Sequence, residues 1–520
     1  MEVNHEISSD DPLLKDIPAI ADHALATLDR LQGRTSHLRE VETTPEEGED
    51  KKPAEFRNMG DINCTHAGNG ERFILWFGNK VRYCPPFEWW FIWNEKEGRW
   101  ARDEMGQIFE NGKSVIKYLY IEAANAPNKD RRQEIAKWAI LCEKPGAVTQ
   151  LLESARTDPE IAVGIDLFDS DPLHLNLLNG WVDLQTMELH PHSKKKFFTM
   201  MIPVSYDPTA TCPKWIAFLK RIYKSNPEKD KIIDFLQRAI GYTLTGDTSE
   251  RAIFLMHGLG ANGKTVFIRV LEALFGDYGT SVSSSTFTTA MATNVRNDLA
   301  RLKGKRFVWA SENSTETTLD AENIKRWTGG DTVVCRFLFK EEFTYRPNFK
   351  IWWIFNHKPK IKDATDSIWD RINLIPCDER IPKDEQDKRL SDKLLTELPG
   401  ILNWALDGWK LVAVNGLQPP AAVKEATKEY RVSEDFIADF LDEYFEMVSQ
   451  EEIDKCSINE DIRLPFKSIW AVWVEYTKQN NFAKTPSKQF LGRRLEERPG
   501  LKKYHISTEK GYIGLRFKRR

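Results

Sequence analysis

The sequence predicts an α/β fold, in which a phosphate-binding core follows an N-terminal α+β accessory region and precedes a C-terminal winged-helix-like domain. A strand, a glycine-rich loop and an amphipathic helix follow one another over residues 251–276. Apolar, strand-like runs recur at 305–313, 349–359 and 367–376, as expected of a parallel sheet. Three helical patterns and a hairpin pattern fill residues 434–520, which is the element order of a winged helix.

The composition is that of a globular protein, with 41% hydrophobic and 29% charged residues among 520. This length predicts several domains. The expected segments are an acidic flexible segment (1–55), a Trp-rich α+β accessory domain (56–165), a helical domain preceding the core (166–246), the core (247–395), a helical connector (396–433) and the winged-helix-like domain (434–520).

Charge is distributed unevenly along the chain, although the net charge is only −4. Residues 1–55 carry 14 Asp and Glu against 6 Lys and Arg, whereas residues 484–520 carry 12 Lys and Arg against 3 Asp and Glu. The basic end is typical of a domain that faces DNA, and a solvated basic tail is the alternative. Without an apolar run of membrane-spanning length or a signal peptide, we expect an intracellular, cytoplasmic protein with no membrane partner.

The N-terminal part contains a possible helix at 12–32, an acidic linker at 42–55 and then aromatic runs. The runs RFILWFG (72–78) and WWFIWN (89–94) are strand-like in length and residue type. We expect their tryptophans to form a packed β core, with base stacking as the less common alternative. Helices are expected within 130–160, 213–243 and 387–430, and two strands within 176–192.

The loop GLGANGKT lies between an apolar strand and an amphipathic helix. Its glycines allow backbone N–H groups to surround phosphates at the positive end of the helix dipole. Lys264 is expected to reach the β- and γ-phosphates, and Thr265 to bind Mg²⁺. The predicted ATP-binding residues are Gly258, Gly260, Ala261, Asn262, Gly263, Lys264 and Thr265.

Hydrolysis requires more than phosphate binding, because it needs an acid, a γ-phosphate sensor and a cation. Glu312 ends one apolar strand and is the candidate for water activation and Mg²⁺ binding. Asn356 ends the next strand and is the candidate sensor, and Arg371 precedes a third apolar run. Each residue alone would more often be solvated or would cap a helix, so their assignment to hydrolysis rests on their order behind one glycine-rich loop.

These segments together resemble the motor of superfamily 3 helicases, in particular the branch of phage, plasmid and poxvirus-type primase-helicases. The resemblance rests on GLGANGKT, WASEN, NIKRWTGGDTVVCRFLFKEEFTYRPNFK, IFNHKP and WDRI, and on the helical region upstream. It covers about residues 170–380, and the winged-helix-like end extends it.

This resemblance implies an AAA+ fold, a homo-hexameric ring, and ATP with Mg²⁺ bound between subunits, so that Arg371 acts on the neighbour's ATP. It also implies a hairpin over the run from Val333 to Phe339 and beyond, whose tip contacts single-stranded DNA through Lys340 first and Arg336 second. Many relatives have two adjacent acids where Glu312 is followed by Asn313. Either Glu312 serves both metal and water, or another acid such as Asp331 shares the task.

The resulting hypothesis is an ATP-dependent DNA helicase that replicates a phage, plasmid or related mobile element in a bacterial host or virus-infected cell. Its partners would be single-stranded and forked DNA, with Lys488, Arg493 and Arg494 contacting phosphates from a C-terminal helix. The run FDSD (168–171) does not make a convincing primase site, so a separate primase or polymerase is expected to supply priming. The alternatives are an AAA+ loader or defence sensor that assembles on DNA without unwinding it, and a P-loop ATPase that does not act on DNA.

Overall fold

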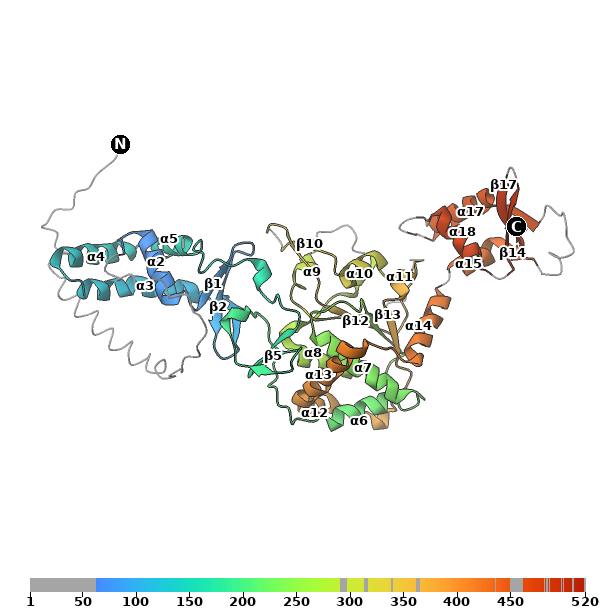
Figure 1. Cartoon of the computed structure of the whole chain (residues 1–520), viewed down its shortest axis with the longest axis horizontal. Helices are drawn as coiled ribbons and strands as arrows, with labels where there is room; N and C mark the ends of the chain where they lie inside the picture. The colour runs from blue at the N-terminus through green and yellow to red at the C-terminus, as the bar shows by residue number, and fades with distance from the viewer. Residues whose placement is uncertain are drawn as a thin grey trace. The chain divides into compact units, whose positions relative to one another are not determined.

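The computed structural model describes residues 62–518 except 290–296, 313–316, 338–339, 362–364, 435, 449–461, 481, 483–484, 486, 497, 499 and 507–508. The helix expected at 12–32 and the linker expected at 42–55 lie outside the described residues. The chain forms two compact units (Figure 1), one of residues up to 170 with 193–199 and one of residues 171–192 with 200–520. None of the described helices combines the length and apolar character needed to cross a bilayer.

The described residues of the first unit contain a three-stranded antiparallel sheet in the order β1-β2-β3 and four α-helices. Its elements are α2 (His66–Phe77), β1 (Val81–Cys84), β2 (Trp89–Asn94), β3 (Arg99–Arg102), α3 (Gln107–Ala124), α4 (Lys129–Cys142), α5 (Ala147–Ala155) and the 3₁₀ helices η4 (Ile165–Leu167) and η5 (Lys194–Lys196).

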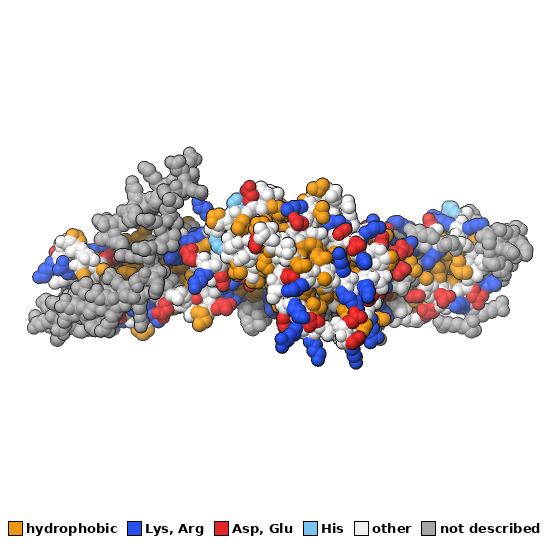
Figure 2. Space-filling model, turned by 90° about the horizontal axis from the view of Figure 1, so that it is seen from below, with side chains coloured by type: hydrophobic (Ala, Val, Ile, Leu, Met, Phe, Trp, Pro, Cys, Tyr) orange, Lys and Arg blue, Asp and Glu red, His pale blue; other side chains and the backbone are white. Residues whose placement is uncertain are grey.

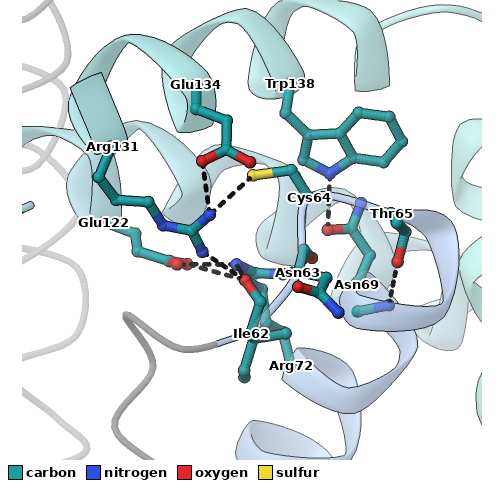
Figure 3. Close-up of polar contacts among 11 residues, drawn as sticks. Ile62, Asn63, Cys64, Thr65, Asn69, Arg72, Glu122, Arg131, Glu134 and Trp138 are labelled. Carbon is teal, nitrogen blue, oxygen red and sulfur yellow. Dashed lines mark hydrogen bonds and ion pairs between the residues drawn. The ribbon is translucent and has the colours of Figure 1, made fainter.

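The strand predicted at 72–78 is wrong, because this run belongs to helix α2. Thr65 caps the helix by accepting a hydrogen bond from the Gly68 N–H at 3.0 Å. The fully buried Arg72 then pairs with both carboxylate oxygens of Glu122 on α3, each at 2.7 Å (Figure 3). Capping and this tertiary contact therefore override the strand-like residue types of the run.

The aromatic cluster of the first unit is a packed core, as expected. Trp93 and Trp100 are buried, with ring centroids 5.4 Å apart. Phe91 packs against Phe168 at 4.5 Å, and the Arg82 guanidinium lies 4.7 Å from the Trp100 ring. These rings are engaged by side chains of the same unit and are not available for stacking on bases.

The second unit is built around a five-stranded sheet in the order β13-β7-β12-β9-β8, with every neighbouring pair parallel. Strands β7, β12 and β13 are made largely of apolar residues because helices cover the sheet. The strands of the unit up to residue 376 are β4 (His174–Leu177), β5 (Gly180–Asp183), β6 (Leu189–His190), β7 (Ile253–His257), β8 (Gly279–Ser281), β9 (Phe307–Glu312), β10 (Val333–Cys335), β11 (Phe343–Tyr345), β12 (Lys350–Phe355) and β13 (Ile372–Pro376).

The helices of this unit supply most of the apolar cover of the sheet. Trp215 of α6 stacks on Phe267 of α8 at 5.5 Å, and Phe254 of β7 stacks on Trp352 of β12 at 4.5 Å. The helices are α6 (Pro213–Ile222), α7 (Lys229–Leu244), α8 (Lys264–Phe275), α9 (Asn297–Ala300), α10 (Ala321–Thr328), α11 (Asp366–Trp369), α12 (Leu390–Leu395), α13 (Leu398–Asn415), α14 (Ala421–Ser433) and the 3₁₀ helices η6 (Gly276–Tyr278), η7 (Ser284–Phe287) and η9 (Lys383–Glu385).

Two buried basic residues, Arg306 and Lys350, lie where β9 and β12 begin. Arg306 donates to the carbonyls of Leu244 and His174, and Lys350 donates to the carbonyl of Thr245. Leu244 and Thr245 form the C-terminal end of α7, where the helix dipole is negative. The end of α7 is therefore tied to the first residues of two central strands.

The described residues within 436–518 form helices and short antiparallel strand pairs around their own apolar cluster. Trp473 and Leu491 are fully buried in this cluster, together with Phe440. The elements are α15 (Phe436–Tyr444), β14 (Phe445–Met447), β15 (Arg463–Pro465), α17 (Phe466–Gln479), α18 (Lys488–Glu496), β16 (Lys502–Ile506), β17 (Glu509–Ile513) and β18 (Leu515–Phe517). The predicted helices are present here, and the terminal strands pair as β15-β17-β16 and β14-β18.

Candidate functional site

The glycine-rich loop connects the carboxyl end of β7 to the start of α8. Gly260, Ala261 and Gly263 have positive φ angles of 99°, 51° and 84°. A Cβ on Gly258 would lie 2.2 Å from the carbonyl oxygen of Cys377, so glycine is required there. Helix α8 begins at Lys264 with no side-chain cap, which leaves its first N–H groups for an anion.

The Lys264 side chain lies inside this loop and is 5% exposed. Its Nζ donates to the Gly258 carbonyl at 2.6 Å and to the side-chain oxygen of Asn262 at 3.0 Å, and it lies 3.4 Å from the side-chain oxygen of Asn356. Asn262 in turn donates to the Cys377 carbonyl at 2.8 Å. Burial lowers the pKa of Lys264, opposed by Cys377 and Asp378.

Glu312 and Asn356 end two neighbouring strands at the same edge of the sheet. Glu312 is the last residue of β9 and pairs in register with Phe355, which precedes Asn356. This edge is the carboxyl end of the parallel strands, where the glycine-rich loop also begins. The structure therefore brings the backbone of Glu312 together with Asn356, Lys264 and Thr265.

A cavity of about 750 Å³ opens at this edge. It reaches from the glycine-rich loop and the strand ends to α6 and to residues 381–393. Lysine and arginine side chains gather on the face that carries α6 and α12 (Figure 2). Its lining includes Gly260, Ala261, Asn262, Gly263, Lys264, Thr265, Ser311, Asn356, Lys214, Phe218, Arg221, Ile381, Leu390 and Lys393.

The far wall of the cavity was not predicted from the sequence. Arg221 of α6 binds Glu379 at 2.7 Å and Glu385 at 2.6 Å, which holds the segment after β13 against α6. Within that segment the Ile381 N–H donates to the Ala261 carbonyl at 2.8 Å, so it is also bonded to the glycine-rich loop. The amphipathic pattern of residues 213–222 predicted the helix, but no local pattern identified its neighbours.

Arg371 does not lie at the cavity. It immediately precedes β13, which is parallel to β7, so it sits at the amino end of the strands, opposite the glycine-rich loop. Its Nε donates to the Thr328 hydroxyl at 3.0 Å and its Nη1 donates to the Ser367 carbonyl. Burial lowers the pKa of Arg371, and Asp331, which does not line the cavity, is close enough to oppose this shift. Arg371 therefore cannot reach the cavity of its own chain in this structure.

The expected hairpin is present as the antiparallel pair β10 and β11. Its strands are shorter than the predicted run from Val333, because pairing covers only Cys335↔Phe343 to Val333↔Tyr345. Arg336 and Lys340 lie in the segment that connects the two strands, and both are half-buried. The Lys340 N–H donates to the Phe337 carbonyl at 3.0 Å. Both DNA candidates thus belong to the connection between the strands.

The C-terminal candidates lie on α18, as predicted. Lys488 and Arg493 are exposed, and Arg494 is half-buried with its guanidinium 6.0 Å from the Phe490 ring. Leu491 and Leu495 bury the opposite side of this helix. The helix therefore presents basic residues on the side that faces away from its apolar cluster.

Two family models match the chain. The model described as "D5 N terminal like" matches residues 70–224, and the "Family of unknown function (DUF5906)" matches residues 256–371. The second match contains the glycine-rich loop from Gly258 onward and ends at Arg371.

Among curated proteins, the chain is 27% identical over 341 residues to "Putative helicase 121R" of Invertebrate iridescent virus 3, covering 59% of this chain and 35% of that protein. It is 28% identical over 272 residues to "Putative helicase L207/L206" of Acanthamoeba polyphaga mimivirus, covering 48% and 28%. The chain spans about a third of the length of these relatives. It is also 24% identical over 217 residues to "Putative primase C962R" of African swine fever virus, covering 40% and 22%.

Among solved structures, the apo C-terminal region of NrS-1 aligns with a TM-score of 0.45 and 12% identity, covering 84% of this chain and 95% of that one. The DUF5906 match lies within the region of about residues 170–380 that carries the sequence resemblance, and the D5-type match overlaps the start of that region. Together these matches support a D5-like primase-helicase family for this chain.

Proposed function

We propose that this chain is an ATP-dependent DNA helicase of superfamily 3, with an AAA+ core that works as a homo-hexamer in the replication of a virus, phage or related mobile element. The observation that carries the proposal is the convergence of Lys264, Thr265, Asn356 and the end of β9 on one cavity. The helicase names of the viral relatives agree with it.

The residues at the cavity fit a magnesium nucleoside triphosphate. The uncapped start of α8 and the Lys264 ammonium would hold the phosphates, and Phe218 with Ile381 offers an apolar wall for the base. No group of three or more His, Cys, Asp or Glu residues that could hold a metal occurs in the described part of the chain. Mg²⁺ is commonly held by phosphate oxygens and few side chains, here the Thr265 hydroxyl and Glu312.

Each residue then has a distinct task. Lys264 binds and orients the γ-phosphate, and Asn356 fixes it from the neighbouring strand while remaining bonded to Lys264. Glu312 orients the attacking water and accepts its proton. Bound Mg²⁺ supplies charge neutralisation at the phosphates. Arg371 supplies a further cation to the site of the adjacent subunit.

DNA contact is assigned to the connection between β10 and β11, through Lys340 and Arg336, and to Lys488, Arg493 and Arg494 on α18. The C-terminal residues are proposed to act in a winged-helix domain that contacts phosphates of forked DNA. Priming is proposed to come from a separate primase or polymerase.

The test is DNA-stimulated ATP hydrolysis and strand displacement on a forked substrate, measured with particle size in a non-hydrolysable ATP analogue. We expect hexameric particles, stimulation by single-stranded DNA and unwinding, with ATP hydrolysis and unwinding lost in Lys264→Ala. Stimulation and assembly without strand displacement would favour a loader or sensor instead. A monomer that hydrolyses ATP without responding to DNA would refute the proposal.

A further inference from the structure

The far wall of the candidate cavity includes residues 379–388, which we call the strap. The strap follows β13, and its residues 385–388 line the cavity. The side chains of Ile381 and Leu390 pack on the apolar core, whereas every residue of 382–388 is exposed. Burial therefore fixes the strap near its two ends and not in its middle.

Backbone hydrogen bonds fix the strap at its start. The Ile381 N–H donates to the Ala261 carbonyl of the glycine-rich loop at 2.8 Å. In the 3₁₀ helix η9, by contrast, the bonding stays within the strap, because the Glu385 N–H donates to the Pro382 carbonyl at 3.1 Å. An exposed segment with few hydrogen bonds to its surroundings opens locally at a low free energy. The position of the middle of the strap therefore depends on side-chain contacts.

Arg221 supplies such a contact to two points of the strap. Its Nε and Nη2 donate to one carboxylate oxygen of Glu385 at 2.9 and 2.6 Å, and its Nη1 donates to Glu379 at 2.7 Å. The planar guanidinium can bind both carboxylates at once, which the single ammonium of a lysine does less well. A further ion pair joins Asp387 to Lys393 of α12 at 2.6 Å. Ion pairs thus hold the strap to α6 and to α12.

Helix α6, which carries Arg221, is itself fixed in the core. Its Trp215 and Phe218 side chains are buried, and the Trp215 N–H donates to the Glu397 carboxylate at 3.0 Å. Phe218 also lines the cavity, on the wall proposed for the base. The helix is therefore a fixed wall, to which the exposed middle of the strap is tied by the Arg221 guanidinium.

We propose that Arg221 is a positioning residue, which holds the strap closed beside a bound nucleotide and thereby slows the release of ADP. This inference rests on the proposed function, because it places a nucleotide in the cavity. An arginine that lines such a cavity could instead bind phosphate oxygens, but here two carboxylates already occupy the guanidinium. Arg221 acts through Glu385 and Glu379, so that opening of the strap for product release requires these ion pairs to break.

The key variant is Glu385→Ala, because the two possible tasks of Arg221 predict opposite results. If the ion pair holds the strap closed, the off-rate of ADP should rise at least about threefold, as expected of one partly exposed ion pair. If Arg221 bound phosphates itself, the same variant would free its guanidinium and lower the off-rate, which would overturn the proposal. Stopped flow measures the off-rate when the whole chain, loaded with N-methylanthraniloyl-ADP and Mg²⁺, is mixed with excess ATP.

Asp384→Ala is the matched control for Glu385→Ala. Asp384 is the neighbouring exposed acid, and its carboxylate has no hydrogen bond or ion pair among the described residues, so this variant should release ADP at the wild-type rate. Single-turnover hydrolysis of ATP by Glu385→Ala should stay within about twofold of wild type, because Lys264 and Thr265 are unchanged. Arg221→Lys, which keeps the charge without the planar fork, should give an intermediate off-rate.

Ionic strength provides a measurement that a general loss of structure would not reproduce. Salt screens partly exposed ion pairs, so the wild-type off-rate should rise with salt from about 0.05 to about 0.5 M, and that of Glu385→Ala should rise less. An unchanged off-rate in Glu385→Ala, or an equal salt dependence in both proteins, would overturn the proposal and leave the proposed function standing. Failure of the unmodified chain to bind the fluorescent nucleotide would instead refute the proposed function, and this inference with it.

Discussion

The Lys264 ammonium lies 3.4 Å from the side-chain oxygen of Asn356, so the glycine-rich loop and the end of β12 share a polar contact. The same ammonium donates to the Gly258 carbonyl and to Asn262. Asn356 therefore lies beside the cation that is proposed to meet the γ-phosphate. A ligand that displaces the contacts of Lys264 would therefore also break its contact with Asn356, the residue that follows β12.

Replacing Asn356 with alanine should slow hydrolysis and spare nucleotide binding. The remaining loop and Lys264 would still hold the phosphates, while one oriented polar group is lost in the transition state. We expect kcat to fall about 10²-fold, as for other single transition-state donors, with Kd changed less than threefold. Stopped-flow binding and steady-state ATPase assays would measure the two effects, with Asn111→Ala on α3 as the control. Wild-type hydrolysis by the Asn356 variant would remove the sensor assignment.

Lys340→Ala should impair DNA binding and unwinding while leaving basal ATP hydrolysis nearly unchanged. Basal ATPase should stay within about twofold, because Lys340 does not line the cavity. Unwinding should be lost, and the slope of log K against log salt for single-stranded DNA should fall by about 0.7 per lost phosphate contact. The neighbouring Glu341→Ala is the matched control for the hairpin, and Arg336→Ala should show the weaker form of the defect. Normal unwinding by Lys340→Ala would exclude this hairpin contact.

Glu122→Gln should loosen the first unit locally. Arg72 is fully buried, and removal of its carboxylate partner leaves an uncompensated charge, which typically costs about 3–5 kcal/mol. Hydrogen exchange of the α2 amides should show that the free energy of local opening falls by about that amount. Glu134→Gln breaks the exposed pair with Arg131 and should cost less than about 1 kcal/mol. Equal protection of α2 in both variants would contradict the structural role of Arg72.

Lys350 should make stability depend on pH. Burial, followed by the charge of Arg306, lowers the pKa of Lys350 well below its usual value of 10.5. Between that lowered pKa and about 10.5 the unfolded chain binds more protons than the folded one, so stability should rise with pH by up to about 1.4 kcal/mol per pH unit. Differential scanning fluorimetry at pH 7.5 and 9.5 should show wild type gaining Tm relative to Lys350→Met. Parallel pH profiles of the two proteins would contradict this.

The sequence predicted those parts of the site that depend on local pattern. Apolar runs with a polar residue at the end located Glu312 and Asn356, because parallel strands of similar length end at one edge of a sheet. The glycine spacing located Lys264 and Thr265 in the same way. Three-residue β8 was not predicted, since so short a strand has no period of its own.

The remaining parts depend on contacts between distant segments. Arg221 meets Glu379 and Glu385 about 160 residues later, and neither partner identifies the other from spacing. In the first unit, burial of Arg72 against Glu122 selected a helix where the aromatic run indicated a strand. Long-range pairing of charged groups thus accompanies one contact that residue patterns left undetermined and one element that they predicted wrongly.

Asn356 and Arg371 lie at opposite ends of the parallel sheet, and the paired strands β12, β7 and β13 connect them. Strands of five or six residues linked in this way do not stretch. A rotation of the sheet that moves Asn356 towards a phosphate should therefore move the Arg371 guanidinium, at the other end of the strands, by a comparable distance. In the proposed ring, rotation of one subunit upon ATP hydrolysis would therefore move its Arg371 relative to the cavity of the next subunit, and no flexible segment between the two cavities would be needed.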